Sequence, residues 1–206
     1  SAEDLKIRGA GSLFGYNQSG GSLVGFELYN KLLSKSISGM LNKDNDEIDT
    51  VFVDIYEGNS FFPRSYVEES GLRVALYKEC LSINDSNKVE SFLNHTKNRF
   101  GLSPQPVLNL INTQKLRILC LGVGVQTINR KGLEIRIVIA DLNLFSSIEA
   151  FVAVIAKAML KRDYSFKKLP GDRLLLIFNL LDKNEDIYMF LSDLLNKFRY
   201  TFKKGN

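Results

Sequence analysis

Histidine, cysteine and tryptophan are scarce in this chain of 206 residues, which contains one His, two Cys and no Trp. A zinc site built on several histidines is excluded because His95 is the only imidazole, and Cys80 and Cys120 lie too far apart in sequence for a CxxC half-site. A Ser-His-Asp or Cys-His arrangement would also need His95, and no nucleophile motif surrounds that residue. We therefore predict no catalytic residue, no cofactor-binding residue and no metal ligand in this chain.

Long apolar runs are lacking as well. The longest one, from Phe151 to Leu160, is interrupted by Lys157, and it is far shorter than the roughly 20 residues that a membrane-spanning helix needs. The chain does not open with a basic segment followed by an apolar one, so we expect no secretion signal. Two cysteines in a chain of this size are typical of a reduced protein. We therefore expect a cytoplasmic localisation and no membrane partner.

Charge of one sign is not in large excess. The chain has 27 Lys and Arg residues against 23 Asp and Glu residues, which gives a formal net charge of +4, and 45% of its residues are hydrophobic. These values are typical of a globular protein. The densest basic groups are separated pairs, namely Lys161-Arg162, Lys167-Lys168 and Lys203-Lys204. A free-standing nucleic-acid-binding module stays open as an alternative function, and a strong salt dependence of DNA binding would favour it.

Glycine is concentrated at the start, where six of the fifteen glycines fall within the first 25 residues. Such density predicts a compact, irregular loop. A P-loop would need Lys after its last glycine, but Tyr16 follows Gly15, and the dinucleotide pattern Gly-x-Gly-x-x-Gly fails because Phe14 stands in its last position. A small enzyme with a glycine-rich phosphate site is a third hypothesis, and it lacks a general base near the loop. Gly122 and Gly124 follow a strand-like run, and we interpret them as a β-bulge.

A polar segment divides the chain. Apolar residues recur at helical spacing from Phe26 to Leu41, which predicts an amphipathic helix after the glycine-rich loop. Residues 42–47 are polar and acidic without an apolar anchor, which is typical of a linker. The predicted organisation is an amino-terminal part, residues 1–41, a linker, residues 42–49, and one compact domain, residues 50–206.

Helical and strand patterns alternate within the predicted compact domain. The predicted helices cover residues 66–81, 86–100, 104–116, 145–160 and 187–198. The predicted strands cover residues 50–55, 119–128, 133–140, 164–169 and 173–179, and the last four form two β-hairpins with glycine in their turns. Helix 145–160 is apolar on most sides, so we expect it to be deeply buried. Helices interleaved with short β-hairpins, without a βαβ rhythm, predict the α+β class.

Two sets of motifs resemble a known family. Asp-Leu-Lys-Ile-Arg-Gly-Ala-Gly-Ser-Leu-Phe-Gly at residues 4–15, continued to Gln18, closely resembles the end of the translocation motif of bacterial transcription-repair coupling factors, which the RecG helicase shares. Arg-Val-Ala-Leu-Tyr-Lys at residues 73–78 and Arg-Phe-Gly-Leu-Ser-Pro-Gln-Pro at residues 99–106 resemble the carboxy-terminal domain of these factors, which RecG lacks. The order and spacing of the motifs agree with the family as far as about residue 122.

This resemblance implies a fragment of an ATP-dependent double-stranded DNA translocase that couples transcription to nucleotide excision repair. The parent protein would use ATP and Mg²⁺, displace RNA polymerase and recruit the repair protein UvrA, whereas this fragment would need no cofactor and have no enzyme activity. The translocation motif would include Arg8, Gly9, Gly11 and Gln18. In the family its Arg and Gln couple the nucleotide state to movement on DNA, and a guanidinium suits this role because it makes fixed bidentate contacts.

The resemblance also implies a role for residues 50–206. In the family this domain is a regulatory lid, which masks the UvrA-binding module until the motor is engaged. The helix ahead of Arg-Phe-Gly offers acidic residues to that module, and the matching positions here are His95 and Asn98. A helical wheel places both away from the apolar stripe of the helix, so we expect them to be exposed. Together with Arg99 they form the candidate partner face.

Overall fold

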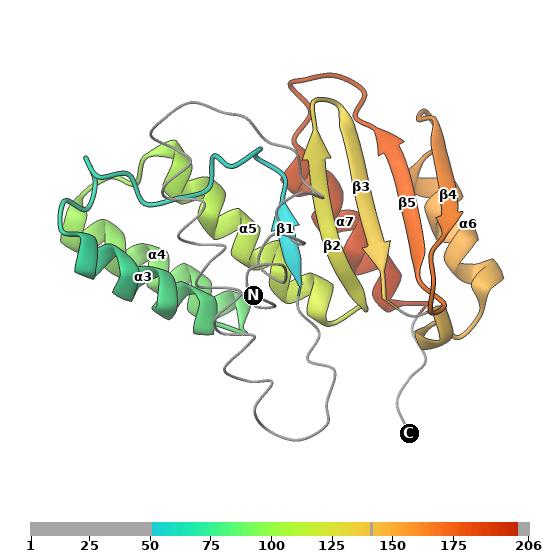
Figure 1. The fold of residues 1–206 in the computed structure, drawn as a ribbon, viewed down its shortest axis with the longest axis horizontal. Helices are drawn as coiled ribbons and strands as arrows, with labels where there is room; N and C mark the ends of the chain where they lie inside the picture. The colour runs from blue at the N-terminus through green and yellow to red at the C-terminus, as the bar shows by residue number, and fades with distance from the viewer. Residues whose placement is uncertain (1–50, 141, 202–206) are drawn as a thin grey trace, which may run out of the picture.

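The computed structural model describes residues 51–140 and 142–201. These residues form five α-helices and one five-stranded β-sheet (Figure 1), so the predicted α+β class is confirmed. The glycine-rich loop, the amphipathic helix from Phe26 and the linker at residues 42–49 lie outside the described residues. The division of the chain at the linker therefore stays a prediction.

The sheet joins strands that are distant in the sequence. Its strands lie in the order β1 (Phe52–Asp54), β2 (Val125–Lys131), β3 (Glu134–Ile139), β5 (Leu174–Asn179) and β4 (Tyr164–Lys168). β1 runs parallel to β2, whereas all other neighbours in the sheet are antiparallel. Both predicted hairpins, β2–β3 and β4–β5, are confirmed. Gly132 and Gly171 have φ angles of 62° and 73° in the two turns, a region that favours glycine.

The helices cover one face of the sheet and extend beyond its β1 edge. α5 (Gln105–Leu121), α7 (Ile187–Arg199) and α6 (Ile148–Ala158) lie behind the sheet in Figure 1. α3 (Ser70–Ser82) and α4 (Ser86–Phe100) lie side by side next to α5, and a short 3₁₀ turn, Leu142–Leu144, precedes α6. None of the helices in the described part of the chain is long and apolar enough to cross a membrane.

Two apolar cores hold these layers together. One lies among α3, α4 and α5 and includes Phe62, Tyr77 and Phe92. The other lies between the sheet and α5, α6 and α7 and includes Ile137, Phe178 and Phe198. α5 contributes to both, because Leu110 belongs to the first core and Leu116 to the second. This shared helix fixes the position of the α3–α4 pair relative to the sheet.

The boundary between α5 and β2 differs from the prediction. Residues 119–121 were expected in a strand, but α5 continues to Leu121 because the buried Leu116 and Cys120 extend its apolar side by another turn. Gly122 is the C-cap of α5, and Gly124 has a φ angle of 62° in the turn that follows. The predicted bulge at these glycines is therefore wrong. The register of β2 shifts a little later, between Val125 and Thr127.

Two other helices are shorter than predicted. α6 begins at Ile148, and only Phe151 and Ile155 within it are fully buried, whereas Ile148 is 54% exposed. The expectation of deep burial on most sides is wrong, because α6 lies at the outer end of the helical layer, where α7 flanks only one side of it (Figure 1). α3 begins at Ser70 rather than at Tyr66, whose side chain makes a contact described below.

Candidate interaction surface

The candidate partner face lies on α4, which is capped at both ends. The carboxylate of Asp85 accepts a hydrogen bond from the backbone N–H of Asn87 at 2.8 Å. At the other end the backbone N–H of Gly101 donates to the carbonyl of Lys97 at 2.9 Å, and Gly101 has a φ angle of 86°. The caps make α4 begin and end at the predicted residues.

One side of α4 is buried. Val89, Phe92 and Thr96 line this side, and the ring of Phe92 lies 6.4 Å from the ring of Phe62 in an edge-to-face arrangement. The hydroxyl of Thr96 donates to the carbonyl of Leu93 at 2.9 Å, so its polar group is satisfied inside the helix. This buried side fixes the rotation of α4 about its axis and therefore decides which residues face solvent.

The opposite side of α4 is exposed and polar. Short uncharged side chains form its centre line, which consists of Asn87, Ser91, Asn94 and Asn98. Three longer side chains form its basic margin, which consists of Lys88, His95 and Arg99. All seven are exposed, so the expected exposure of His95 and Asn98 is confirmed, and the two residues share one side of the helix with Arg99.

Tyr66, which lies in the loop before α3, holds the carboxyl end of α4. The hydroxyl of Tyr66 donates to the carbonyl of Gly101 at 3.1 Å and lies 3.2 Å from the hydroxyl of Ser103. The Tyr66 ring packs 5.7 Å from the ring of Phe100. No local pattern reveals this contact, because Tyr66 is far from Gly101 in the sequence.

α4 is joined to α5 by an ion pair. Glu90, which is the only acidic residue within α4, bonds to the ammonium of Lys115 on α5. The carboxylate of Glu90 is therefore engaged within the domain. No local pattern predicts this pair, since the two residues are 25 positions apart in the sequence.

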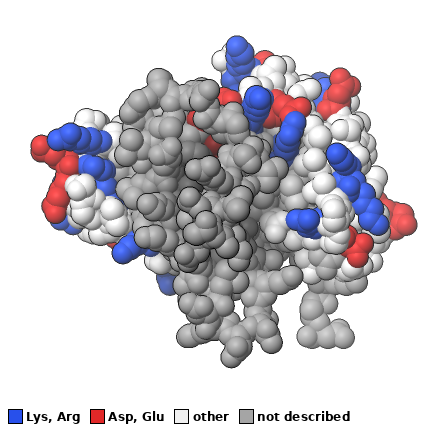
Figure 2. All heavy atoms as spheres, viewed as in Figure 1, with Lys and Arg blue, Asp and Glu red and all other residues white. Residues whose placement is uncertain are grey.

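Charged side chains are mixed elsewhere on the visible surface. Figure 2 shows Lys and Arg side chains singly or in small groups, with Asp or Glu side chains close to many of them. No continuous basic patch covers the described atoms on this face. A nucleic-acid-binding protein is expected to have a basic stripe or patch, and the described atoms on this face show none.

Neither cysteine is a candidate nucleophile. Cys80 and Cys120 are both free and fully buried. Burial raises the pKa of the Cys80 thiol to about 12, and burial also raises the pKa of Cys120. Both thiols are therefore protonated at neutral pH and out of reach of a substrate, as expected for structural cysteines.

One buried carboxyl group has a structural role. Asp54, at the end of β1, is 2% exposed, and burial raises its pKa. Its carboxyl oxygen accepts a hydrogen bond from the backbone N–H of Gly58 at 3.0 Å. This contact orders a loop in which Glu57 and Gly58 have φ angles of 50° and 80°. A substrate has no access to Asp54.

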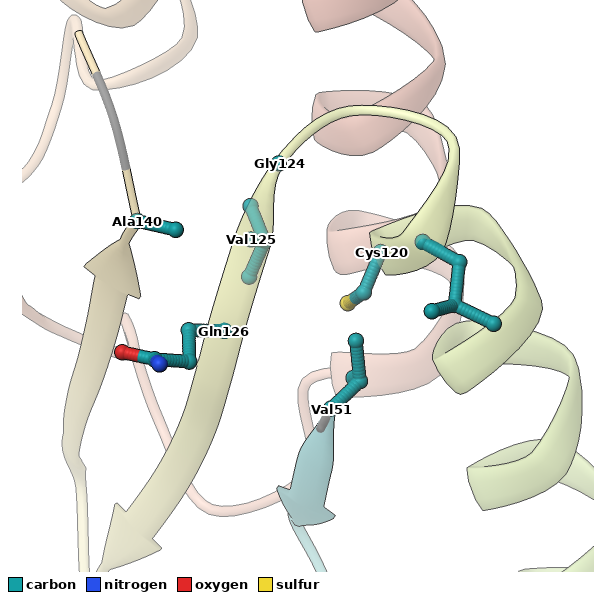
Figure 3. Close-up of a pocket in the computed structure, with 7 residues that line it drawn as sticks. Val51, Cys120, Gly124, Val125, Gln126 and Ala140 are labelled. Carbon is teal, nitrogen blue, oxygen red and sulfur yellow. The ribbon is translucent and has the colours of Figure 1, made fainter. Parts of the chain in front are cut away.

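Two hollows in the described part of the chain are poor candidates for a ligand site. One lies between the end of α5 and the start of β2 (Figure 3), and its lining includes Val51, Cys120, Val125 and Ala140. It has no room for a water molecule. Another is an open depression beside Arg64, Ser65 and Glu68. Among residues 51–140 and 142–201, no group of three or more His, Cys, Asp or Glu side chains could hold a metal ion.

The residues of the predicted translocation motif lie outside the described residues. Arg8, Gly9, Gly11 and Gln18 all belong to the segment before Val51. The relation between this motif and α4 therefore stays a prediction.

This chain is similar in sequence to proteins of one family. The model of the TRCF domain family matches residues 57–146. This segment contains α3, α4, α5, β2, β3 and the 3₁₀ turn that follows β3. The transcription-repair-coupling factor of Rickettsia prowazekii is 31% identical over 189 residues, which cover 89% of this chain and 16% of the relative. The Escherichia coli factor is 29% identical over 139 residues, or 64% of this chain and 12% of that protein. The Buchnera aphidicola factor is 28% identical over an alignment that covers all of this chain and 25% of that protein.

A solved structure shares the fold. The crystal structure of the C-terminal domain of transcription-repair coupling factor matches with a TM-score of 0.58 at 18% identity, covering 74% of this chain and 97% of that domain. This chain spans 16% of the length of the Rickettsia prowazekii relative, so it corresponds to a small part of such a protein. The chain belongs to the family of transcription-repair coupling factors, and its described residues have the fold of the carboxy-terminal domain of that family.

Proposed function

We propose that this chain is a non-catalytic regulatory module of a transcription-repair coupling factor. We also propose that the candidate partner face on α4 helps to mask the UvrA-binding module of the parent protein. The observation that carries the proposal is the exposed polar side of α4 in a domain with the fold of the family's carboxy-terminal domain. The centre line and basic margin of α4 leave a polar surface free for a partner. The parent would be the ATP- and Mg²⁺-dependent DNA translocase, with RNA polymerase, UvrA and double-stranded DNA as its partners.

A lid of this kind works by a shift in population. Contacts between exposed polar side chains contribute about 1 kcal/mol or less each. Loss of one or two of them therefore changes the balance between closed and open states without unfolding the domain. The shift equals the difference in contact free energy between the two states. A few weak contacts suit a mask that the working motor must release.

Removing two side chains of the candidate partner face tests whether this side of α4 contributes to the lid contact. We expect the double variant His95→Ala/Asn98→Ala of the full-length parent to bind UvrA more tightly by up to about tenfold, because the loosened lid is open for more of the time. The melting temperature should stay nearly unchanged, since both side chains are exposed. The measurement is UvrA affinity at one salt concentration, together with melting curves.

The matched control removes two exposed polar side chains elsewhere. The double variant Ser165→Ala/Asn196→Ala changes β4 and α7, which are remote from α4, and it should leave UvrA affinity as it is. Equal UvrA affinity of the His95/Asn98 variant and the wild type, with equal melting, would remove this side of α4 from the lid contact. A large melting loss would instead make the two residues structural.

The fragment is also expected to turn over no ATP. The sequence lacks a Walker lysine followed by Ser or Thr, which a P-loop needs in order to hold the phosphates and Mg²⁺. Purified chain should release no phosphate from ATP above a protein-free control, with or without double-stranded DNA. DNA-stimulated release of phosphate that persists through further purification would refute the proposal that the fragment is non-catalytic.

A further inference from the structure

We propose that the free edge of β4 binds β4 of a second copy of this chain, so that two copies form one continuous sheet. The edge surface consists of β4 together with Ile148 and Val152 on α6. The inference goes beyond the proposed function, because β4 and α4 lie at opposite ends of the domain (Figure 1). A contact at one end leaves the other end open.

The backbone of β4 offers hydrogen-bonding groups on its outer side. β4 is the last strand of the described sheet, in which its neighbour is β5. Its register with β5 continues to Leu169, whose backbone N–H donates to the carbonyl of Arg173 at 2.9 Å. Hydrogen-bonded and non-hydrogen-bonded pairs alternate in an antiparallel ladder, so the N–H and C=O groups of Tyr164, Phe166 and Lys168 point away from β5. An edge of this kind is a template for another strand.

Aromatic side chains lie beside this edge. Tyr164 and Phe166 are opposite the core residues Phe178 and Leu176 of β5, so their side chains lie on the face of the sheet that the helices cover. They are nevertheless 38% and 36% exposed, and their rings are 5.7 Å apart in an edge-to-face arrangement. The helical layer therefore does not close over the last strand.

α6 extends beyond β4 behind the sheet (Figure 1), and part of its surface is apolar and exposed. Ile148 and Val152 lie one helical turn apart and are 54% and 39% exposed, whereas Phe151 and Ile155 are buried in the core. Because α7 packs against one side of α6, the exposed pair lies on the side without a helical neighbour. A partner beside β4 would cover this side as well.

A second copy fits the edge because β4 is complementary to itself. In the antiparallel register centred on Phe166, all five residues of the two strands overlap, and the three outward-facing residues form hydrogen-bonded pairs. Phe166 then lies opposite the same residue of the second copy, and Lys168 lies opposite Tyr164, whose ring attracts a cation. A register with Phe166 opposite Lys168 would instead place Lys167 opposite its own copy, where like charges repel.

The same arrangement completes the helical layer. A two-fold axis perpendicular to the joined sheet places the helices of both copies on the same face. The two α6 helices then become neighbours across the axis, and each covers the exposed Ile148 and Val152 of the other. An extended peptide from another protein would pair with the edge but would leave this side of α6 exposed. The second copy is therefore the occupant that accounts for both features.

Sedimentation velocity of the 206-residue chain tests the inference. A strand of five residues gives a weak interface, so we expect monomers at about 1 µM and dimers at about 100 µM. Phe166→Pro removes an outward N–H and a ring without removing a hydrogen bond to β5, and it should weaken dimerisation about tenfold or more. Val152→Glu brings one carboxylate per copy to the α6 contact and should also weaken dimerisation about tenfold.

The register of the two strands has a test of its own. In the Phe166→Cys variant the two thiols lie across a hydrogen-bonded pair with Cα atoms about 5.5 Å apart, a distance that a disulfide can span. Oxidised glutathione takes up the two electrons and protons of the thiols and should give a covalent dimer. Ser165→Cys should react much more slowly, because Ser165 lies opposite Lys167 in this register. Cys80 and Cys120 are buried and do not compete.

A control variant and melting curves separate the outcomes. Leu102→Glu changes an apolar residue that is 83% exposed in the loop between α4 and α5, away from β4, and it should dimerise like the wild type. Melting curves show whether each variant is folded. A wild type that stays monomeric at about 100 µM would overturn the second copy as the occupant. Dimers that resist both Phe166→Pro and Val152→Glu would place the contact elsewhere and overturn the inference, and faster cross-linking at Ser165 than at Phe166 would overturn the register.

Discussion

Phe151→Ala is expected to lower the free energy of unfolding by about 3–5 kcal/mol, the usual range for deleting a buried aromatic ring. Phe151 on α6 is fully buried, and its ring lies 4.3 Å from the ring of Phe145 and 5.1 Å from the ring of Phe198 on α7. The three rings join the turn before α6, α6 itself and α7. Loss of the Phe151 ring leaves a cavity that the neighbouring side chains cannot fill, because β5 and α7 form the other side of the same core.

The matched control for this effect is the next residue of the same helix. Val152 is 39% exposed, so Val152→Ala should cost no more than about 1 kcal/mol. Both variants are measured by urea unfolding with circular dichroism detection. A loss at Phe151 no larger than the loss at Val152 would mean that the ring cluster does not hold α6 to α7. Phe151→Leu should recover part of the stability, since it refills most of the cavity.

Arg162→Ala is expected to lower the free energy of unfolding by about 2–3 kcal/mol, because it leaves the Glu185 charge without compensation in a partly buried site. Arg162 bonds to Glu185, and the two side chains are only 6% and 15% exposed. The guanidinium also lies 4.1 Å from the centroid of the Phe190 ring on α7. Glu185 in turn accepts a hydrogen bond from the backbone N–H of Leu181 at 2.8 Å. The pair thus joins the segment after α6 to the segment before α7.

This ion pair also predicts how stability depends on pH. The hydrogen bond from Arg162 lowers the pKa of Glu185 below its ordinary value of 4.5. A carboxyl group whose pKa is lower in the folded state stabilises the fold above the unfolded pKa, and this contribution is lost as the pH falls through the folded pKa. The contribution of Glu185 is therefore present at neutral pH and disappears below pH 4.5, in the range of the lowered pKa.

Unfolding curves at neutral and acid pH test whether the ion pair stabilises the fold and whether its contribution depends on pH. The stability difference between wild type and Glu185→Gln should be large at neutral pH and should shrink as the pH falls below 4.5. The control is Lys197→Ala, which removes an exposed ion pair with Asp193 and should cost no more than about 0.5 kcal/mol. A Glu185→Gln effect that is constant across this pH range would show that the carboxylate charge does not stabilise the fold.

Short-range patterns predicted the elements that carry the candidate surface. The N-cap Asp85, the apolar stripe of Val89 and Phe92 and the terminal Gly101 predicted α4 and its exposed side. The turns at Gly132 and Gly171 predicted the two hairpins. Each of these features depends on interactions within a few residues, so the chain needs no distant partner to specify it. The exposure of His95, Asn98 and Arg99 follows from the same periodicity.

Contacts between residues far apart in the sequence determine the strand order, the burial of the helices and several polar contacts. The pairing of β3 with β5, which unites the hairpins, and the parallel β1–β2 pairing both join residues far apart in sequence. The contact of Tyr66 with Gly101 and the ion pair of Arg162 with Glu185 do so as well. α6 is apolar enough for a central helix, yet its place at the end of the layer buries only one side. Local patterns specify elements through nearest neighbours, whereas strand order, helix burial and long-range polar contacts depend on which surfaces meet after the chain has folded.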